Sequence, residues 1–277
     1  MTSSVHTNTS ALIALQNLNK TNERLADVQG RINTGLKVQG AKDNASIWAI
    51  AQGQRADMGA LAAVKMSLDR ATSIADVALA AGESVSDLLI QLKEKVVAAN
   101  DSSLKTQSRE LLNADFQAIL RAIGQAINNA TFDGANILNG ALTNGIQFLA
   151  NAEANAFVTL GARNLSLGGA IMEISNADSL LTMTGATTAL SRLDNSIAQL
   201  NAALGEIGSQ AKQIAAHNTF VSKLMDTLEA GIGNLVDADL ARESARLNAL
   251  QVQQQLGAQA LSIANQAPQI ILSLFRS

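Results

Sequence analysis

The sequence of 277 residues has no cysteine and no tyrosine, and it has one proline and one tryptophan. Without cysteine, disulfide bonds, thiolate metal sites and a cysteine nucleophile are excluded. Aromatic residues make up only 3% of the chain although 47% of it is hydrophobic, so the aliphatic side chains suit helix–helix seams better than a thick globular core. Because the commonest helix breaker, proline, occurs only once (Pro268), long helices are the default, and we predict a mostly α fold.

The charge and hydropathy patterns exclude two classes of partner. The formal net charge of −3 gives no general attraction to nucleic acid or to anionic lipid. Residues 1 to 7 contain neither the basic start nor the apolar core of a cleaved secretory signal. A membrane-inserting secretion translocator would need an uninterrupted apolar span of about 20 residues, which the sequence lacks. We therefore expect no nucleic-acid partner and no membrane insertion.

The residues that usually carry chemistry are few and scattered. The two histidines, His6 and His217, lie far apart in the sequence with no repeated acidic pattern beside them. Asp237 and Asp239 lack the rest of a calcium loop and fit a helix cap better. The pair Gly168 and Gly169 lacks the spacing of a phosphate-binding loop and fits a turn. We expect no catalytic, cofactor or metal site.

Apolar periodicity predicts long helices on both sides of a central irregular segment. Residues 10 to 33 place Ala11, Leu18, Leu25 and Ile32 seven apart, which predicts a helix with a partner. Further helices are predicted over residues 45 to 99, 104 to 129 and 177 to about 228. The glycines Gly231 and Gly233 predict a break before the last segment. Between residues 131 and 175, Asp-Gly and Asn-Gly pairs separate short apolar runs and predict β-hairpins.

The last segment has no charged residue between Arg246 and Arg276. Its seven Gln and two Asn residues make a transmembrane helix too costly. Its apolar side chains still form a stripe, which consists of Val252, Leu256, Ile263, Ile270 and Leu274. An uncharged, amide-rich helix of this kind is typical of burial against protein on several sides. The N-terminus is similarly free of Asp, Glu, Lys and Arg up to Lys20, so we expect the two ends to pair and to assemble.

Several ordered motifs resemble those of a known family. Near the N-terminus, the chain reads HTN at residues 6–8, ALQNL at 14–18, RINTGLKV at 31–38 and AKDNA at 41–45. Near the C-terminus, it reads DADLARES at 237–244, QVQQQ at 251–255 and ANQAP at 264–268. Between them stands FDGANILNG at 132–140. Nearly the whole chain thereby resembles the bacterial flagellins, in a short form that lacks the variable outer domains.

The resemblance implies a fold and a function. Residues 1–45 and 230–277 would form an inner-tube coiled coil, and residues 46–229 an outer helical rod with a β-hairpin at about 131–175. The chain would polymerise with copies of itself into the extracellular flagellar filament, after type III export without cleavage. Its other partners would be hook-associated proteins, the filament cap and a flagellin export chaperone. The nearest alternative is a hook-filament junction protein, which shares flagellin-like ends.

Two sets of site residues follow. The assembly interface is predicted to include residues on both terminal stripes: Leu18, Leu25, Ile32, Val252, Leu256, Ile263, Ile270 and Leu274. Many flagellins carry O-linked glycans, and the candidate hydroxyls here lie in and beside the hairpin region: Thr143, Thr159, Ser166, Ser175, Ser179, Thr182 and Thr184.

Overall fold

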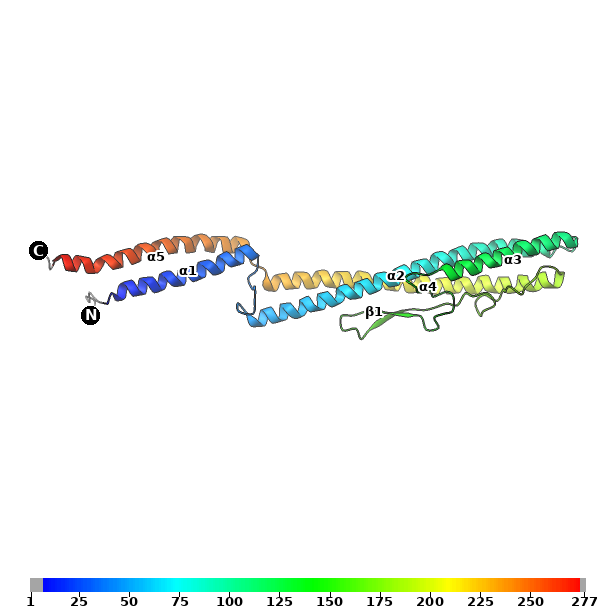
Figure 1. Ribbon diagram of the computed structural model, residues 1–277, viewed down its shortest axis with the longest axis horizontal. Helices are drawn as coiled ribbons and strands as arrows, with labels where there is room; N and C mark the ends of the chain where they lie inside the picture. Colours follow the sequence, from blue (N-terminus) through cyan, green and yellow to red (C-terminus); the bar gives the residue numbers. More distant parts are fainter. Residues whose placement is uncertain (1–6, 275–277) are drawn as a thin grey trace. The chain divides into compact units, whose positions relative to one another are not determined.

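The computed structural model describes residues 7–274, with side chains described for residues 7–266. Within that range the chain forms five helices and one pair of strands (Figure 1). The elements in order are α1 (Thr9–Thr34), α2 (Ala45–Ala99), α3 (Thr106–Asn129), β1 (Ile146–Leu149), β2 (Phe157–Leu160), α4 (Met183–Val236) and α5 (Leu240–Leu274). The predicted mostly α fold is confirmed.

The chain divides into two compact units. The terminal unit consists of Met1–Ala56 and Thr227–Ser277, and the central unit consists of Asp57–Asp226. The ranges expected from the sequence, 1–45 with 230–277 and 46–229, place the first boundary at the start of α2 rather than inside it.

In the terminal unit, both helices have defined ends. Asn8 begins α1 as its N-cap, because its Oδ1 accepts a hydrogen bond from the Ala11 N–H (3.0 Å). Gly35 ends the helix in the left-handed region with φ of 72°, which glycine adopts without strain. Asp239 begins α5, since its Oδ1 accepts from the Arg242 N–H (3.1 Å). This contact confirms the capping role predicted for Asp239.

The predicted break at Gly231 and Gly233 is wrong. Helix α4 continues through both glycines to Val236, because an isolated glycine costs a helix only about 1 kcal/mol relative to alanine. The chain turns instead after Val236, whose carbonyl accepts from the Lys37 N–H (2.6 Å). The Ala238 N–H then donates to the Gly35 carbonyl (2.8 Å). Backbone pairing with the segment after α1 therefore sets the break.

The core of the central unit lies along α2, α3 and α4. Its fully or almost fully buried side chains are mostly aliphatic: Leu68, Leu89, Leu92, Phe116, Leu120, Ile123, Leu193, Leu200 and Ile207. Burying each such side chain stabilises the unit by about 1.5–3 kcal/mol. Helices α2 and α4 approach closely where Gly82 faces Leu204, since a Cβ at Gly82 would lie 2.2 Å from Leu204 Cδ2.

Of the hairpins predicted between residues 131 and 175, the structure has one, and the predicted Asp-Gly and Asn-Gly turns all lie before its first strand rather than between its strands. Strands β1 and β2 pair antiparallel, with Ile146 opposite Leu160 and Leu149 opposite Phe157. Hydrogen bonds hold the strand ends on the helices. The Leu149 N–H donates to Ser67 Oγ of α2 (3.2 Å), and the Gly161 N–H donates to Gln210 Oε1 of α4 (2.7 Å).

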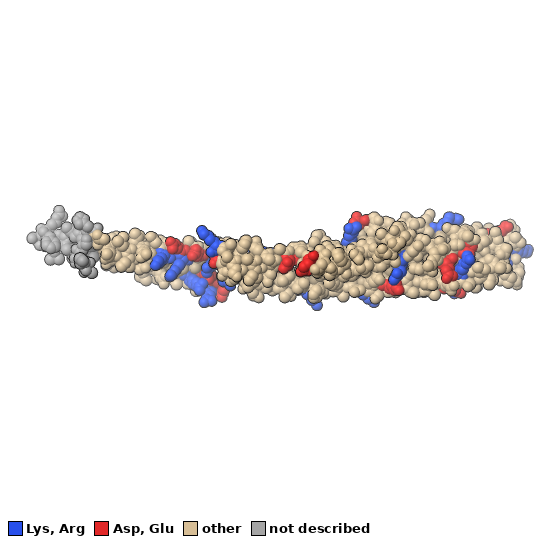
Figure 2. Space-filling view, turned by 90° about the horizontal axis from the view of Figure 1, so that it is seen from below, with Lys and Arg blue, Asp and Glu red and all other residues tan. Residues whose placement is uncertain are grey.

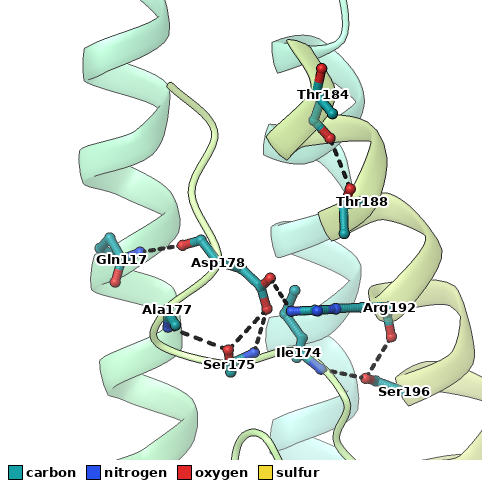
Figure 3. A network of polar contacts seen from close by, with 9 residues as sticks. All are labelled: Gln117, Ile174, Ser175, Ala177, Asp178, Thr184, Thr188, Arg192 and Ser196. Atoms are coloured by element: carbon teal, nitrogen blue, oxygen red, sulfur yellow. Dashed lines mark hydrogen bonds and ion pairs between the residues drawn. The ribbon is translucent and has the colours of Figure 1, made fainter. Parts of the chain in front are cut away.

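Helix α4 begins at Met183 rather than at the predicted Ala177. The residues before it form a loop that Asp178 holds against α3 and α4 (Figure 3). Arg192 Nη1 donates to Asp178 Oδ1 (2.5 Å), and the Ser175 N–H donates to Asp178 Oδ2 (2.8 Å). From α3, Gln117 Nε2 donates to the Asp178 carbonyl (2.8 Å). Because the side chain and the carbonyl of Asp178 are engaged in these contacts, the chain stays in a loop here and α4 begins later than predicted.

Candidate assembly surfaces

Helices α1 and α5 of the terminal unit pack along one seam (Figure 1). The less exposed residues of each helix recur at alternating steps of three and four, the spacing of a coiled coil. On α1 they are Ala11, Ala14, Leu18, Thr21, Leu25, Val28 and Ile32. On α5 they are Glu243, Leu247, Leu250, Gln254, Gly257, Leu261 and Ala264.

Polar contacts fix the antiparallel register of this seam. Asn8 Nδ2 donates to the Ala264 carbonyl (2.6 Å), and Gln254 Nε2 donates to Asn22 Oδ1 (2.7 Å). Between these two contacts, Gly257 lets the helices come close, since a Cβ there would lie 3.2 Å from Leu18 Cδ1. A shift of either helix would break both hydrogen bonds, so the pair has one preferred alignment.

Other large apolar side chains lie on the outside of the helix pair. On α1, Leu12 and Ile13 are each 59% exposed and Leu15 is 43% exposed. On α5, Val252 is 55%, Leu256 is 57% and Ile263 is 69% exposed. We call these six residues the outward rows. Val252, Leu256 and Ile263 share one face of α5, and Leu12, Ile13 and Leu15 lie within one turn of α1, off the seam row. Exposed apolar side chains grouped in this way mark an interaction surface.

The structure separates the predicted interface residues into two groups. Leu18, Leu25 and Ile32 lie on the seam row of α1, whereas Val252, Leu256 and Ile263 lie on the outward row of α5. The side chains of Ile270 and Leu274 lie outside the described residues. Among the described side chains, the two terminal stripes expected to bury one another therefore do not meet within one chain.

The sequence reasoning missed the α5 side of the seam. Gln254 and Gly257 occupy it together with leucines, and a count of apolar steps of seven skips an amide and a glycine. The signal that could have found them is the alternation of three and four from Glu243 to Ala264. The stripe through Leu256 is thus free for contacts outside the chain.

The candidate glycosylation hydroxyls differ in exposure. Ser166, Ser175 and Ser179 are half-buried, and each hydroxyl donates a hydrogen bond: to the Asn139 carbonyl (3.2 Å), to Asp178 Oδ2 (3.1 Å) and to Asn113 Oδ1 (3.2 Å), respectively. The threonines are exposed: Thr143, Thr159, Thr182 and Thr184. Of these, Thr182 Oγ1 accepts from the Gly185 N–H (3.1 Å) in the first turn of α4.

The remaining polar candidates have structural contacts. His217 Nε2 bonds to the Ala150 carbonyl (2.8 Å) and helps to hold the hairpin, while His6 lies outside the described residues. Gly168 has a φ of 77° and lies in a turn, as expected. Across residues 7–266, no three His, Cys, Asp or Glu side chains gather in a metal-binding geometry. None of the described helices is long and apolar enough to span a membrane.

The family follows from sequence comparison. The model of the bacterial flagellin N-terminal helical region matches residues 5–143, and that of the bacterial flagellin C-terminal helical region matches residues 190–275. The chain belongs to the bacterial flagellin family. Flagellin FljJ of Caulobacter vibrioides is 55% identical over 100% of this chain and 99% of its own length. Flagellin FljM of the same organism is 50% identical over 99% and 98%, respectively.

A solved structure shows the same fold at low identity. The putative flagellar hook-associated protein of Vibrio parahaemolyticus aligns with a TM-score of 0.55 over 70% of this flagellin and 100% of its own chain, at 14% identity. At that identity the likeness concerns the fold alone. The full-length relatives are flagellins, so the comparisons give no support to the hook-filament junction alternative.

Proposed function

We propose that this flagellin is the structural subunit of the helical flagellar filament, an extracellular polymer of identical chains used for swimming. The observation that carries the proposal is the placement of the outward rows. The pairing of α1 with α5 leaves further large apolar side chains exposed on both helices, outside the seam that it encloses. Each Leu or Ile that a neighbour buries contributes up to about 1.5–3 kcal/mol to assembly.

A filament requires the right symmetry as well as apolar surface. The outward row of α1 and that of α5 differ in sequence, so contact between unlike rows is heterologous and can repeat without closing. The stretch after Arg246 also lacks charge, so close packing there leaves no unpaired ion in the wall of a tube. Both features support an open helical polymer.

The work of such a subunit is mechanical. Torque applied at the base of the filament becomes thrust through the shape of the tube, and the protein makes or breaks no bond. The filament is expected to be thin, because the segment between α3 and α4 contains only the hairpin and its loops. This role calls for no cofactor and no metal.

The proposal also includes partners that act in export and partners that contact the two ends of the filament. Exposed Leu12, Ile13 and Leu256 would aggregate in a bare monomer, which supports a flagellin export chaperone that covers the C-terminal segment. Hook-associated proteins and the filament cap would meet the two ends of the polymer. Export through the flagellar type III route leaves the N-terminus intact, so the mature mass is expected to show no loss beyond Met1.

Seeded polymerisation tests the function. Purified monomer is added to short filament fragments, and the protein that sediments with the growing fragments is measured over time. The proposal predicts growth that is proportional to the number of seeds. Monomer that never adds to seeds while its terminal helices resist protease would show that the terminal unit is complete in isolation, and the proposal would be wrong.

A further inference from the structure

A cleft of about 400 Å³ opens between α1 and α5 inside the terminal unit. Arg24, Arg31 and Arg246 line it, and Asp27 is the one acid among its lining residues. Figure 2 shows basic and acidic side chains gathered on one part of this unit, beside a stretch without charge. We call this opening the arginine cleft.

The chain neutralises the arginine cleft only in part. Glu243 is 6% exposed, and its Oε1 accepts a hydrogen bond from Arg246 (2.7 Å). Arg31 Nη1 lies 3.8 Å from the same oxygen, too far for a hydrogen bond. None of the ion pairs of the described chain includes Arg24. The arginine cleft therefore keeps an excess of positive charge.

The two units carry opposite net charge. The terminal unit has nine basic and seven acidic residues, and the central unit has eleven and sixteen, so the values of +2 and −5 add to the −3 of the whole chain. A head-to-tail contact between copies that brings unlike units together is favoured by this difference. The acidic partner of the arginine cleft is thus to be sought on the central unit of another copy.

Helix α2 presents a row of carboxylates with a matching spacing. Asp76, Glu83, Asp87 and Glu94 follow one another at steps of seven, four and seven, which places them on one helix face. All four are exposed, and no ion pair of the described chain includes them. We call this row the acidic face. A step of seven spans about 10.5 Å of helix, and the same step separates Arg24 from Arg31.

We propose that the arginine cleft of one copy binds the acidic face of α2 on a second copy. The inference rests on the proposed function and adds the chemistry of one repeated contact between subunits. Two arginines on α1 and two carboxylates on α2 share the seven-residue rise, so a pair of helices lying along each other can form two ion pairs at once. Arg246 supplies a third guanidinium from α5.

Charge removal at the arginine cleft tests its role. Arg24→Gln removes a lining cation, and Lys20→Gln removes an exposed cation from the same helix without touching the cleft. We expect Arg24→Gln to raise the critical concentration for seeded growth about tenfold, which corresponds to about 1.4 kcal/mol, and Lys20→Gln to leave it nearly unchanged. Equal effects of the two substitutions would overturn the proposal.

Cross-linking identifies the partner surface directly, because the chain has no cysteine of its own. Subunits with Arg24→Cys are polymerised with subunits that carry one of Asp76→Cys, Glu83→Cys, Asp87→Cys or Glu94→Cys, and a short bismaleimide is added. Covalent dimers of unlike subunits are expected from at least one mixture. Filaments that yield no dimer from any of the four, or dimers only within the terminal units, would contradict the inference.

These outcomes separate the inference from the function on which it rests. If wild-type monomer does not add to seeds, the proposed function fails. If wild-type filaments grow but the acidic face does not cross-link to position 24, only the contact between the arginine cleft and the acidic face is wrong.

Discussion

Individual side chains of the terminal unit show which surfaces the chain uses for itself and which it leaves exposed. Leu18 packs against Gly257 in the seam, and Val28 is the one buried residue of α1 in the described chain. Leu256 and Ile263 are more than half exposed. A substitution on the outward row therefore probes assembly with little effect on the pairing of α1 with α5.

The first prediction concerns Leu256→Asp and Ile263→Asp. Each places a carboxylate on the outward row, where a neighbouring subunit would bury it without a partner at a cost of about 3–5 kcal/mol per contact. We expect the monomer to keep its helical circular dichroism and to lose seeded growth, as measured by sedimentation. Leu256→Met is the control that keeps the apolar contact and is expected to grow. Normal filaments from either aspartate variant would mean that this row is not buried.

The second prediction concerns O-linked modification. Ser166, Ser175 and Ser179 use their hydroxyls in hydrogen bonds within the central unit. Peptide mapping of the native protein is therefore expected to place any added mass on the exposed Thr143, Thr159, Thr182 or Thr184 rather than on these serines. An intact mass equal to that of the bare chain would remove the proposal of glycosylation, and a glycan on Ser175 would contradict the preference for exposed threonines.

At the scale of the elements, the loop before α4 depends on one buried carboxylate. Asp178 is 8% exposed and joins Arg192 and Ser175 across the loop and the helix. Asp178→Ala leaves the Ser175 N–H without its acceptor, and we expect it to lower the free energy of unfolding by about 2 kcal/mol. Asp194→Ala breaks the exposed pair with Lys93 (2.7 Å), which is worth less than about 1 kcal/mol. Chemical denaturation measures both, and equal losses would show that the Asp178 network adds no particular stability.

Two glycine substitutions, one next to the hairpin and one in α3, are predicted to change the stability in opposite directions. Gly145 has a φ of 75°, and a Cβ there would lie 2.3 Å from the Leu160 carbonyl oxygen, so Gly145→Ala is expected to cost about 2 kcal/mol or more. Gly124 lies inside α3 with nothing within 4 Å of the Cβ position. Gly124→Ala is therefore expected to stabilise the protein by about 0.5–1 kcal/mol. Thermal unfolding of the two variants should shift in opposite directions, and a shared direction would refute this account of the hairpin.

How far the sequence predicts each element depends on whether local or tertiary contacts define it. The ends of α2 at Ala45 and Ala99 are predicted correctly, because the polar cluster after Ala99 is a local signal. The strands coincide with the apolar runs at Ile146–Leu149 and Phe157–Leu160, but the Asp-Gly and Asn-Gly pairs all precede β1, and the loop between the strands contains no such pair. The start of α4 depends on contacts of Asp178 with residues on α3 and α4, and the end of α4 depends on backbone bonds to the segment after α1. No local pattern encodes those contacts.

The candidate surfaces were partly predictable for the same reason. The uncharged segment after Arg246 points to assembly from composition alone. The division of its apolar residues between the seam and the outward row is set by where Gln254 and Gly257 meet α1, which needs the register of the helix pair.

At the scale of the whole molecule, the chain distributes charge and apolar surface unevenly. The central unit holds most of the buried core of the described chain, although side chains such as Met66, Leu111 and Phe220 are more than half exposed, and it carries a net negative charge. The terminal unit has few buried side chains among its described residues, so we expect it to gain stability from neighbouring copies. The central claim is that the outward rows are exposed in the monomer and buried in the polymer.

Thiol accessibility tests this claim most directly, since every cysteine in a variant is an introduced one. Leu256→Cys reports on the outward row of α5, and Ala177→Cys reports on an exposed loop of the central unit. We predict that a maleimide labels Cys at position 256 readily in the monomer and about tenfold or more slowly in sedimented filaments, a difference of about 1.4 kcal/mol in the barrier, while position 177 keeps most of its reactivity. Equal labelling of position 256 in monomer and filament would contradict the burial of the outward rows.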